Sequence, residues 1–438
     1  MKAPICDFVK NYAESGTLRL HMPGHKGSGG IEALDITEIE GADSLYCADG
    51  IIAESEANAS DLFGCPTFYS AEGSSQCIRA MLYLAVCRAG NKKIVAGRNA
   101  HRAFVSAAAL LDLEVEWLCG GGSYLCCLPT ADDIESTLLS CPEKPAAVYL
   151  TSPDYLGNIA DIRSAAEVCH RHGILLLVDN AHGAYLRFLP EPLHPIGLGA
   201  DLCCDSAHKT LPVLTGGAYL HISSDRAELF SDKVKDALLL FGSTSPSYLI
   251  LQSLDRANLY ISEGYAERLA AFIPKADTMK RRLSKGGFDL LGSEPLKLTV
   301  APKGYGYTGN ELASMLRSHG IECEFADPDF TVMMLSADMT DGELSVLEEA
   351  LTSVPKKAPI SVGPPKIAPS HQAMSIRDAI FAPSEELPIS RCEGRILASL
   401  GVSCPPAVPI VSLGERITAE AIDCFAYYGI TTCRVVRI

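Results

Sequence analysis

Short apolar runs alternate with amphipathic segments from residue 61 to residue 222, and this rhythm constrains the fold more than any other feature. Strands of a parallel sheet that is covered on both faces read as continuous apolar runs. Ser75–Ala89 instead places its apolar residues on one helical face, and Gly90 follows as a helix stop. We therefore predict an α/β fold with a doubly wound, mostly parallel sheet. The predicted strands are 93–96, 115–118, 146–151, 174–178, 200–204 and 217–222, with further helices at 102–113 and 161–173.

The rest of the chain has a different organisation. Strands near 296–301 and 331–336 and helices at 309–318 and 341–353 indicate a small α+β domain, which a Pro-rich stretch separates from the C-terminal module. The predicted parts are an N-terminal arm or lid (1–60), a major domain (61–270), a small α+β domain (271–356), a Pro-rich linker (357–369) and a C-terminal α+β module (370–438).

Composition excludes several classes of partner. The 37 basic against 53 acidic residues give a net charge of −16, which argues against binding nucleic acid through its phosphates. The sequence lacks an apolar run of the roughly 18 residues that a membrane-spanning helix needs, and its start lacks the apolar core of a signal peptide. The 17 cysteines include no C-x-x-C pair, so we expect free thiols in a reducing cytoplasm.

Polar side chains gather directly after four of the predicted strands. These strand ends carry Gly97–His101, Ser152–Tyr155, Asp179–His182 and Asp205–Thr210. Because ligands bind at the carboxyl ends of parallel strands, these groups are expected to line one cleft. The set predicts an enzyme.

Lys209 and Asp179 are the most informative of these residues. A partly desolvated lysine between His208 and Thr210 can attack a carbonyl to form an imine, although an ordinary surface lysine is an alternative. Asp179 ends an apolar run and could face a protonated pyridine nitrogen. A helix cap or a structural ion pair is the alternative for Asp179.

Other candidates surround this pair. Gly73, Ser74, Ser75 and Gln76 open a helix whose N-terminal amides and hydroxyls suit a phosphate, unless the serines only cap the helix. His101 could stack on an aromatic ring or be a structural histidine. His101, His182 and His208 lack the spacing of metal ligands, so we predict no metal.

Several longer strings resemble a known family. They are His21–Gly27, Asp35–Gly41, Arg98–His101, Leu150–Tyr155, Val178–Ala184, Ser206–Pro212, Ser243–Leu249 and, near the C-terminus, Cys404–Pro409 and Leu413–Arg416. Together they resemble the fold-type I pyridoxal-phosphate (PLP) enzymes, and within them the bacterial ornithine/lysine/arginine decarboxylases. The chain is similar to a short form of that family without its N-terminal receiver-like domain.

The resemblance implies a PLP-dependent decarboxylase of arginine, lysine or ornithine that is at least dimeric. Its role is polyamine biosynthesis or acid resistance, and the short form favours biosynthesis by analogy. Lys209 would hold the cofactor as an imine, Asp179 would pair with the ring nitrogen, and Lys209 or His208 would return a proton to Cα. His101 would stack on the ring. Thr244 and Ser245 would reach across a dimer interface, and Glu415 would bind the distal cation of the substrate. Supporting contacts with the cofactor would come from Ser74, Ser75, Gln76, Ala181, His182, Ser206 and His208.

The sequence departs from the family pattern at several positions. Asn180 and Tyr185 replace a Glu and a His of the usual Asp-Glu-Ala-His-Gly-Ala-His string, and Leu413 replaces the Pro of Pro-Gly-Glu. Two alternatives therefore stay open. One is another PLP reaction, such as transamination, with Arg391 or Arg395 as the carboxylate ligand, and the other is a non-catalytic PLP-binding paralogue.

Overall fold

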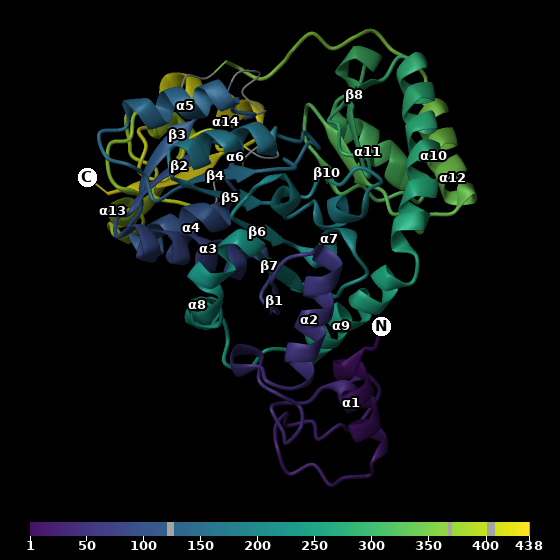
Figure 1. The fold of residues 1–438 in the computed structure, drawn as a ribbon. Helices are drawn as coiled ribbons and strands as arrows, with labels where there is room; N and C mark the ends of the chain where they lie inside the picture. The colour runs from purple at the N-terminus through teal and green to yellow at the C-terminus, as the bar shows by residue number, and fades with distance from the viewer. Residues whose placement is uncertain (121–126, 367–369, 401–407, 438) are drawn as a thin grey trace. The chain divides into compact units, whose positions relative to one another are not determined.

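The computed structural model describes residues 1–120, 127–366, 370–400 and 408–437. The chain divides into two compact units, coloured along the sequence in Figure 1. The first unit comprises residues 1–91, 141–152 and 162–267, and the second comprises residues 92–140, 153–161 and 268–438.

The first unit contains five strands of a mostly buried sheet, in the order β1-β7-β6-β5-β4. β4, β5 and β6 run parallel, while β7 is antiparallel to both β6 and β1. All residues of β6 and β7 are buried, which explains why these strands read as continuous apolar runs. The bounds are β1 (Thr67–Ser70), β4 (Ala147–Thr151), β5 (Leu175–Asp179), β6 (Leu202–Asp205) and β7 (Ala218–Ile222).

Helices of the first unit pack on this sheet and on one another. α3 contacts β5, β6 and β7, and α2 contacts α1 and α9. α3 ends as predicted, with Gly90 left-handed at φ 70° and its N–H bonded to the Val86 carbonyl. The helices are α1 (Pro4–Glu14), α2 (Ile51–Phe63), α3 (Ser74–Ala89), α6 (Ile162–Arg171), α7 (Ala207–Thr210), α8 (Ala227–Leu240) and α9 (Tyr248–Ser262).

A long helix crosses the predicted end of the major domain. α10 (Tyr265–Lys285) continues past residue 270 and contains Pro274. The boundary at 270 therefore falls inside a helix instead of in a loop.

The second unit contains the predicted small α+β domain. Its antiparallel sheet has the order β10-β11-β9-β8, and capping boxes at Thr308–Glu311 and Thr340–Glu343 start its two helices. The bounds are β8 (Asp289–Leu291), β9 (Lys297–Ala301), α11 (Gly309–Ser318), β10 (Phe325–Ala326), β11 (Thr331–Met334) and α12 (Asp341–Thr352). The same unit holds the parallel pair β2 (Lys93–Gly97) and β3 (Glu114–Leu118), with α4 (Arg102–Leu111) and α5 (Ala131–Ser140).

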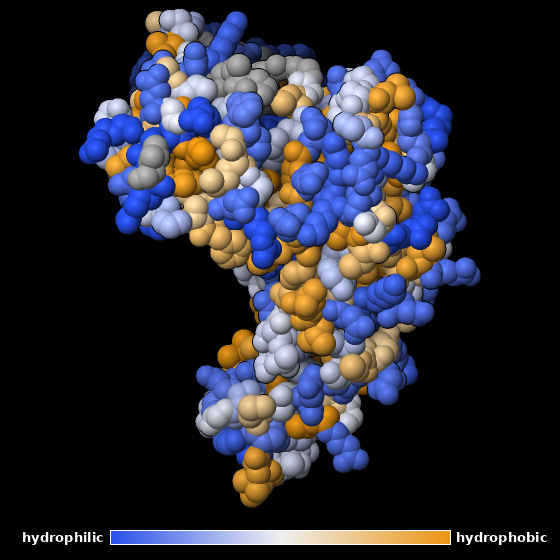
Figure 2. All heavy atoms as spheres, turned by 90° about the vertical axis from the view of Figure 1, so that its left-hand side faces the viewer, coloured by the Kyte–Doolittle hydropathy of each residue, from blue (hydrophilic) through white to orange (hydrophobic). Residues whose placement is uncertain are grey.

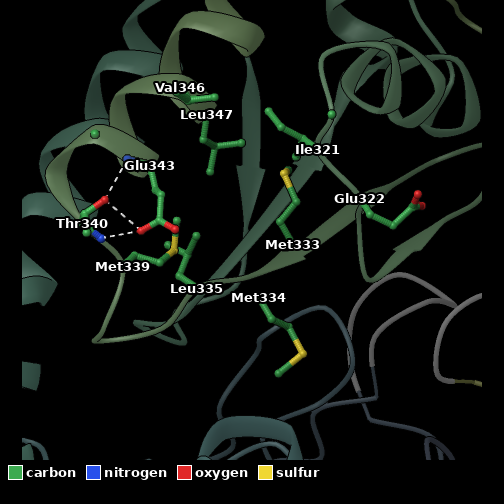
Figure 3. Close-up of a pocket in the computed structure, with 12 residues that line it drawn as sticks. Ile321, Glu322, Met333, Met334, Leu335, Met339, Thr340, Glu343, Val346 and Leu347 are labelled. Carbon is green, nitrogen blue, oxygen red and sulfur yellow. Dashed lines mark hydrogen bonds between the residues drawn. The ribbon is translucent and has the colours of Figure 1, made fainter.

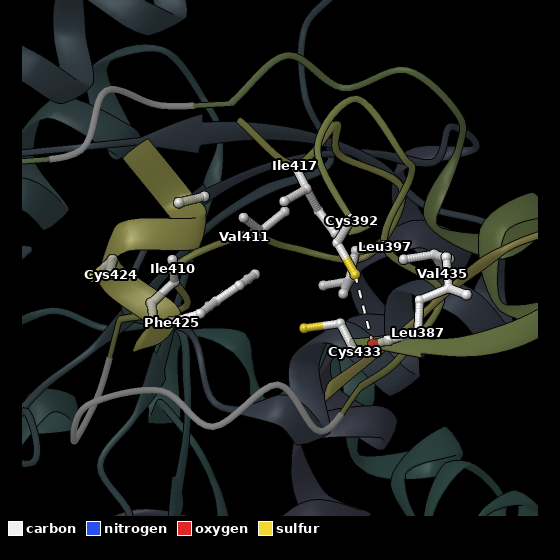
Figure 4. Close-up of a cluster of buried hydrophobic side chains, with 11 residues drawn as sticks. Leu387, Cys392, Leu397, Ile410, Val411, Ile417, Cys424, Phe425, Cys433 and Val435 are labelled. Atoms are coloured by element: carbon white, nitrogen blue, oxygen red, sulfur yellow. Dashed lines mark hydrogen bonds between the residues drawn. The ribbon is translucent and has the colours of Figure 1, made fainter. Parts of the chain in front are cut away.

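The C-terminal module has its own apolar core. Cys392, Ile417, Phe425 and Cys433 lie within a buried cluster between a two-stranded sheet and a helix (Figure 4). Within the same unit, the hydroxyls of Tyr427 and Tyr428 donate to Asp329 of the small domain. The module contains α13 (Ile376–Phe381), β12 (Ser384–Pro388), α14 (Ala419–Tyr427) and β13 (Thr432–Val436).

Hydrophilic and apolar side chains share the surface, and Figure 2 shows a face on which groups of both kinds lie side by side. Among the described residues, no helix is long and apolar enough to cross a membrane.

Candidate active site

The candidate site lies at the carboxyl ends of β5 and β6 in the first unit. The parallel register sets Asp179, the last residue of β5, opposite Cys204 of β6. Directly after β6, the short helix α7 carries His208 and Lys209. A carboxylate therefore ends β5 and an amine follows the neighbouring strand β6, as the order of apolar runs predicted.

Lys209 is half-buried, and its amine contacts an imidazole. Its Nζ lies 3.1 Å from Nε2 of His182, the third residue after β5. His182 itself is buried, with 6% of its surface exposed. The sequence placed both residues at strand ends but did not predict that they touch.

Asp179 is buried and accepts three contacts. One carboxylate oxygen accepts from the Tyr149 hydroxyl at 3.1 Å, and the other accepts from the backbone N–H of Ala181 at 3.1 Å and from the Cys204 thiol at 3.7 Å. Burial, and next to it the charge of Asp179, holds the pKa of Tyr149 well above its usual value, so this hydroxyl stays a donor. Sequence reasoning missed Tyr149, because an aromatic residue in a buried strand reads as core.

The start of α3 fits a phosphate. Gly73 precedes the helix at φ 73° with open space around its Cα, and it provides no side-chain cap. The Ser206 hydroxyl donates to the Ser74 hydroxyl at 2.8 Å, so two hydroxyls from different elements meet beside the N-terminal amides of a 16-residue helix. Ser75 lies in the first turn of the same helix.

Gln76 and His208 each make further contacts. The Gln76 side chain is fully buried, donates to the Tyr46 hydroxyl and the Leu238 carbonyl, and accepts from the Ser70 hydroxyl, so of Gln76 only the backbone amide is left for the predicted phosphate role, which stays a prediction. His208 bonds through Nδ1 to the Gly217 carbonyl at 3.0 Å, and burial lowers its pKa. His208 therefore keeps only Nε2 for a ligand in this tautomer.

A buried network that the sequence did not predict lies behind the site. One oxygen of Asp205 contacts Nε2 of His194 at 3.0 Å and of His221 at 3.1 Å, and the other accepts from the Asn180 amide at 2.7 Å. Burial alone would raise the pKa of Asp205, but the two imidazoles outweigh it and hold that pKa well below its usual value. The ligand atoms of His194, Asp205 and His221 lie within 4.8 Å of one another, a grouping that could also hold a metal ion.

His101 and Glu415 belong to the second unit. His101 is exposed and caps α4, with Nδ1 accepting from the Ala103 N–H at 3.2 Å. Glu415 is 2% exposed, and its two oxygens accept from both terminal nitrogens of Arg98, at 2.5 and 2.7 Å, and from the Ser412 N–H. The predicted ligand of a substrate cation is thus already paired with a cation of its own chain.

Thr244 and Ser245 are exposed in the segment between α8 and α9, and Ala181 is buried beside Asp179. Their predicted roles toward a partner subunit and the cofactor ring stay predictions.

A separate groove in the small domain does not have the chemistry of this site. It encloses about 540 Å³ and is lined by Met333, Met334, Met339 and other apolar residues (Figure 3). Its polar groups Thr340 and Glu343 bond to each other in the capping box of α12.

Comparison with known proteins places these features in a family. The model of the family described as "Orn/Lys/Arg decarboxylase, major domain" matches residues 3–291. An arginine decarboxylase of Bacillus subtilis is 30% identical over 96% of this chain and 92% of its own length. A lysine decarboxylase structure from Francisella novicida superposes with a TM-score of 0.81 at 16% identity, over 99% of this chain and 81% of that one.

A structure of an SPT (serine palmitoyltransferase) variant with PLP gives a TM-score of 0.55 at 14% identity, over 71% of this chain and 79% of that one. These comparisons confirm the predicted α/β fold of type I and the predicted resemblance. They also confirm the expectation of a PLP-dependent amino-acid decarboxylase. The chain belongs to the Orn/Lys/Arg decarboxylase family.

Proposed function

We propose that this chain decarboxylates arginine, releasing carbon dioxide and agmatine, with pyridoxal 5'-phosphate as cofactor. The observation that carries the choice of arginine is the 30% identity to a named arginine decarboxylase over 96% of the chain. The placement of Lys209, Asp179 and the hydroxyls at the start of α3 around one sheet edge supports the cofactor.

Each group of the site has a definite task. When bound, the cofactor supplies a carbonyl that captures an amine and an electron-poor ring that accepts the electrons of the broken Cα–carboxylate bond. Asp179 would pair with the ring nitrogen and keep it protonated, and the Tyr149 hydroxyl and the Ala181 N–H orient its carboxylate. Ser74 and Ser206 would hold the phosphate beside the N-terminus of α3.

Lys209 carries the proton that ends the reaction. A proton must reach Cα after carbon dioxide has left, and the amine of Lys209 would supply it.

Transamination has less support. An aminotransferase needs an arginine for the α-carboxylate, and Arg391 and Arg395 are the candidates. Arg395 donates to Glu385 at 2.7 Å and to the Val436 carbonyl at 2.7 Å, so its guanidinium already serves the C-terminal module.

We also propose a cytoplasmic homodimer with a role in polyamine formation. Thr244 and Ser245 are exposed on the first unit, as residues that reach a neighbouring site must be. The described cysteines are free thiols, which suits a reducing compartment.

The test is release of carbon dioxide from carboxyl-labelled arginine, lysine and ornithine by the PLP-loaded protein. We expect release from arginine, loss of that release in Lys209→Ala, and full release in Lys144→Ala, which removes an exposed lysine of the same unit. Release from lysine or ornithine alone would refute the choice of arginine. No release from any of the three with cofactor attached would refute decarboxylation of these substrates.

A further inference from the structure

We propose that His182 takes the proton that Lys209 must lose before its amine can attack the cofactor carbonyl. This inference rests on the proposed function only in requiring that PLP attaches to Lys209. The observation behind it is the 3.1 Å contact between Lys209 Nζ and His182 Nε2. His182 acts in this role as a general base on the reacting nitrogen, Nζ of Lys209.

The turn that carries His182 is held rigidly. The Gly183 N–H donates to the Asn180 carbonyl at 2.7 Å, and a Cβ at Gly183 would meet the Asn180 side-chain oxygen at 1.9 Å. Only glycine fits that position. The Asn180 side chain is in turn anchored to Asp205, which His194 and His221 hold in place.

The buried network around Asp205 therefore helps to position the imidazole of His182 beside the amine of Lys209. Asp205 fixes Asn180, Asn180 and Gly183 fix the turn, and the turn fixes the imidazole against Nζ. A base acts on a nucleophile only within hydrogen-bond reach, and 3.1 Å is within that reach.

The proton balance is simple. The ammonium of Lys209 starts with three protons, and a protonated amine has no lone pair for attack. One proton passes from Nζ to His182 Nε2, and the freed lone pair forms the bond to the carbonyl carbon. That proton and a second one from Nζ reach the departing oxygen, which leaves as water, while the third stays on the nitrogen of the new C=N bond.

His208 is the other histidine next to Lys209, and its geometry suits a different task. Its Nδ1 is bonded to the Gly217 carbonyl, and burial lowers its pKa. His182 instead directs Nε2 at the amine.

The test measures the rate at which PLP attaches to the apoprotein across pH, with reductive trapping and mass spectrometry to identify the lysine. In His182→Gln, a hydrogen-bonding group remains but cannot take a proton. We expect attachment to Lys209 about tenfold slower or more at pH 7, with the difference shrinking as the pH rises and the amine loses its proton to solvent. His319→Gln, an exposed histidine of the second unit, should match the wild type.

A second variant keeps the test decisive if His182→Gln does not fold. In His182→Ala, added imidazoles should restore the rate, and the more basic imidazoles should restore it more. Wild-type rates across pH in His182→Gln, or no rescue of a folded His182→Ala, would overturn the inference. Failure of the wild type itself to attach PLP at Lys209 would instead refute the proposed function.

Discussion

Replacing Glu415 by Gln is expected to destabilise the second unit strongly. Arg98 and Glu415 are 8% and 2% exposed at their side chains, and two nearly parallel N–H···O bonds join them. The substitution leaves the buried guanidinium without its counter-charge and turns an amide N–H toward Arg98, while the remaining oxygen can still accept from the Ser412 N–H. Breaking a buried pair by removing one partner costs about 3–5 kcal/mol, which is a factor of roughly 10² to 5 × 10³ in the folding equilibrium.

The chain offers its own reporter for this change. Trp117, the single tryptophan, lies in β3 with its ring centroid 5.2 Å from the Arg98 guanidinium carbon. Urea unfolding followed by tryptophan fluorescence therefore reads the environment of the pair directly. We expect a clearly lower midpoint for Glu415→Gln, and recovery of most of the loss when Arg98→Met is combined with Glu415→Leu.

A surface pair of the same geometry is the control. Arg317 donates to both oxygens of Glu322, at 2.9 and 2.6 Å, but both side chains are well exposed. Glu322→Gln should leave the urea midpoint nearly unchanged because water and salt screen the pair. If Glu415→Gln has the wild-type midpoint and instead raises the KM for arginine, the carboxylate holds the substrate and the structural interpretation is wrong.

Three further outcomes test other parts of the molecule. Burial raises the pKa of Asp327 to about 6, so the folded state holds the carboxyl proton more tightly than the unfolded state. The free energy of unfolding should therefore fall by up to about 3 kcal/mol as the pH rises from 4 to 6. In Asp327→Asn, the urea midpoint should lose this dependence on pH. Asp179→Asn should bind PLP, as its absorbance will show, yet lose about 10²-fold or more in kcat, and wild-type kcat would contradict its pairing with the ring. Mixing inactive Lys209→Ala with an inactive Thr244→Ala/Ser245→Ala variant should restore carbon dioxide release if one site uses both subunits, and no recovery despite mixed dimers would exclude the shared site.

The elements that the sequence predicted best are those with local signals. The helix predicted at 309–318 has the bounds of α11, where Thr308 and Glu311 form a capping box. The helix predicted at 102–113 ends two residues earlier, because Asp112 adopts the left-handed conformation at φ 58°. No glycine marks the end of α4, so the helix predicted from the sequence extended beyond Leu111.

The domain boundary has no such local signal. A change of pattern near residue 270 predicted the end of the major domain, and the division between the two compact units lies at residues 267 and 268, inside α10. The helix continues through Pro274, a residue that ordinarily argues against a helix interior, so a local rule would not predict its full length.

Several important contacts join residues that are far apart in the sequence, and no rule of residue spacing predicts such pairs. Arg98 and Glu415 are 317 positions apart, and Lys209 and His182 are 27 apart on different elements. Strand ends could be predicted to share an edge of the sheet, because topology dictates it. Which side chains then pair across that edge depends on turns such as Asn180–Gly183, whose geometry follows from packing.

Asn180 gives the departure from the family pattern a physical meaning. A glutamate at this position would bring a second carboxylate toward Asp205, whose charge already depends on two imidazoles, whereas the asparagine amide donates a hydrogen bond to it. The substitution thus keeps the network satisfied without a further buried charge. The backbone carbonyl of the same residue accepts from the Gly183 N–H and closes the turn that contains His182, so the buried network and the imidazole beside Lys209 meet at Asn180.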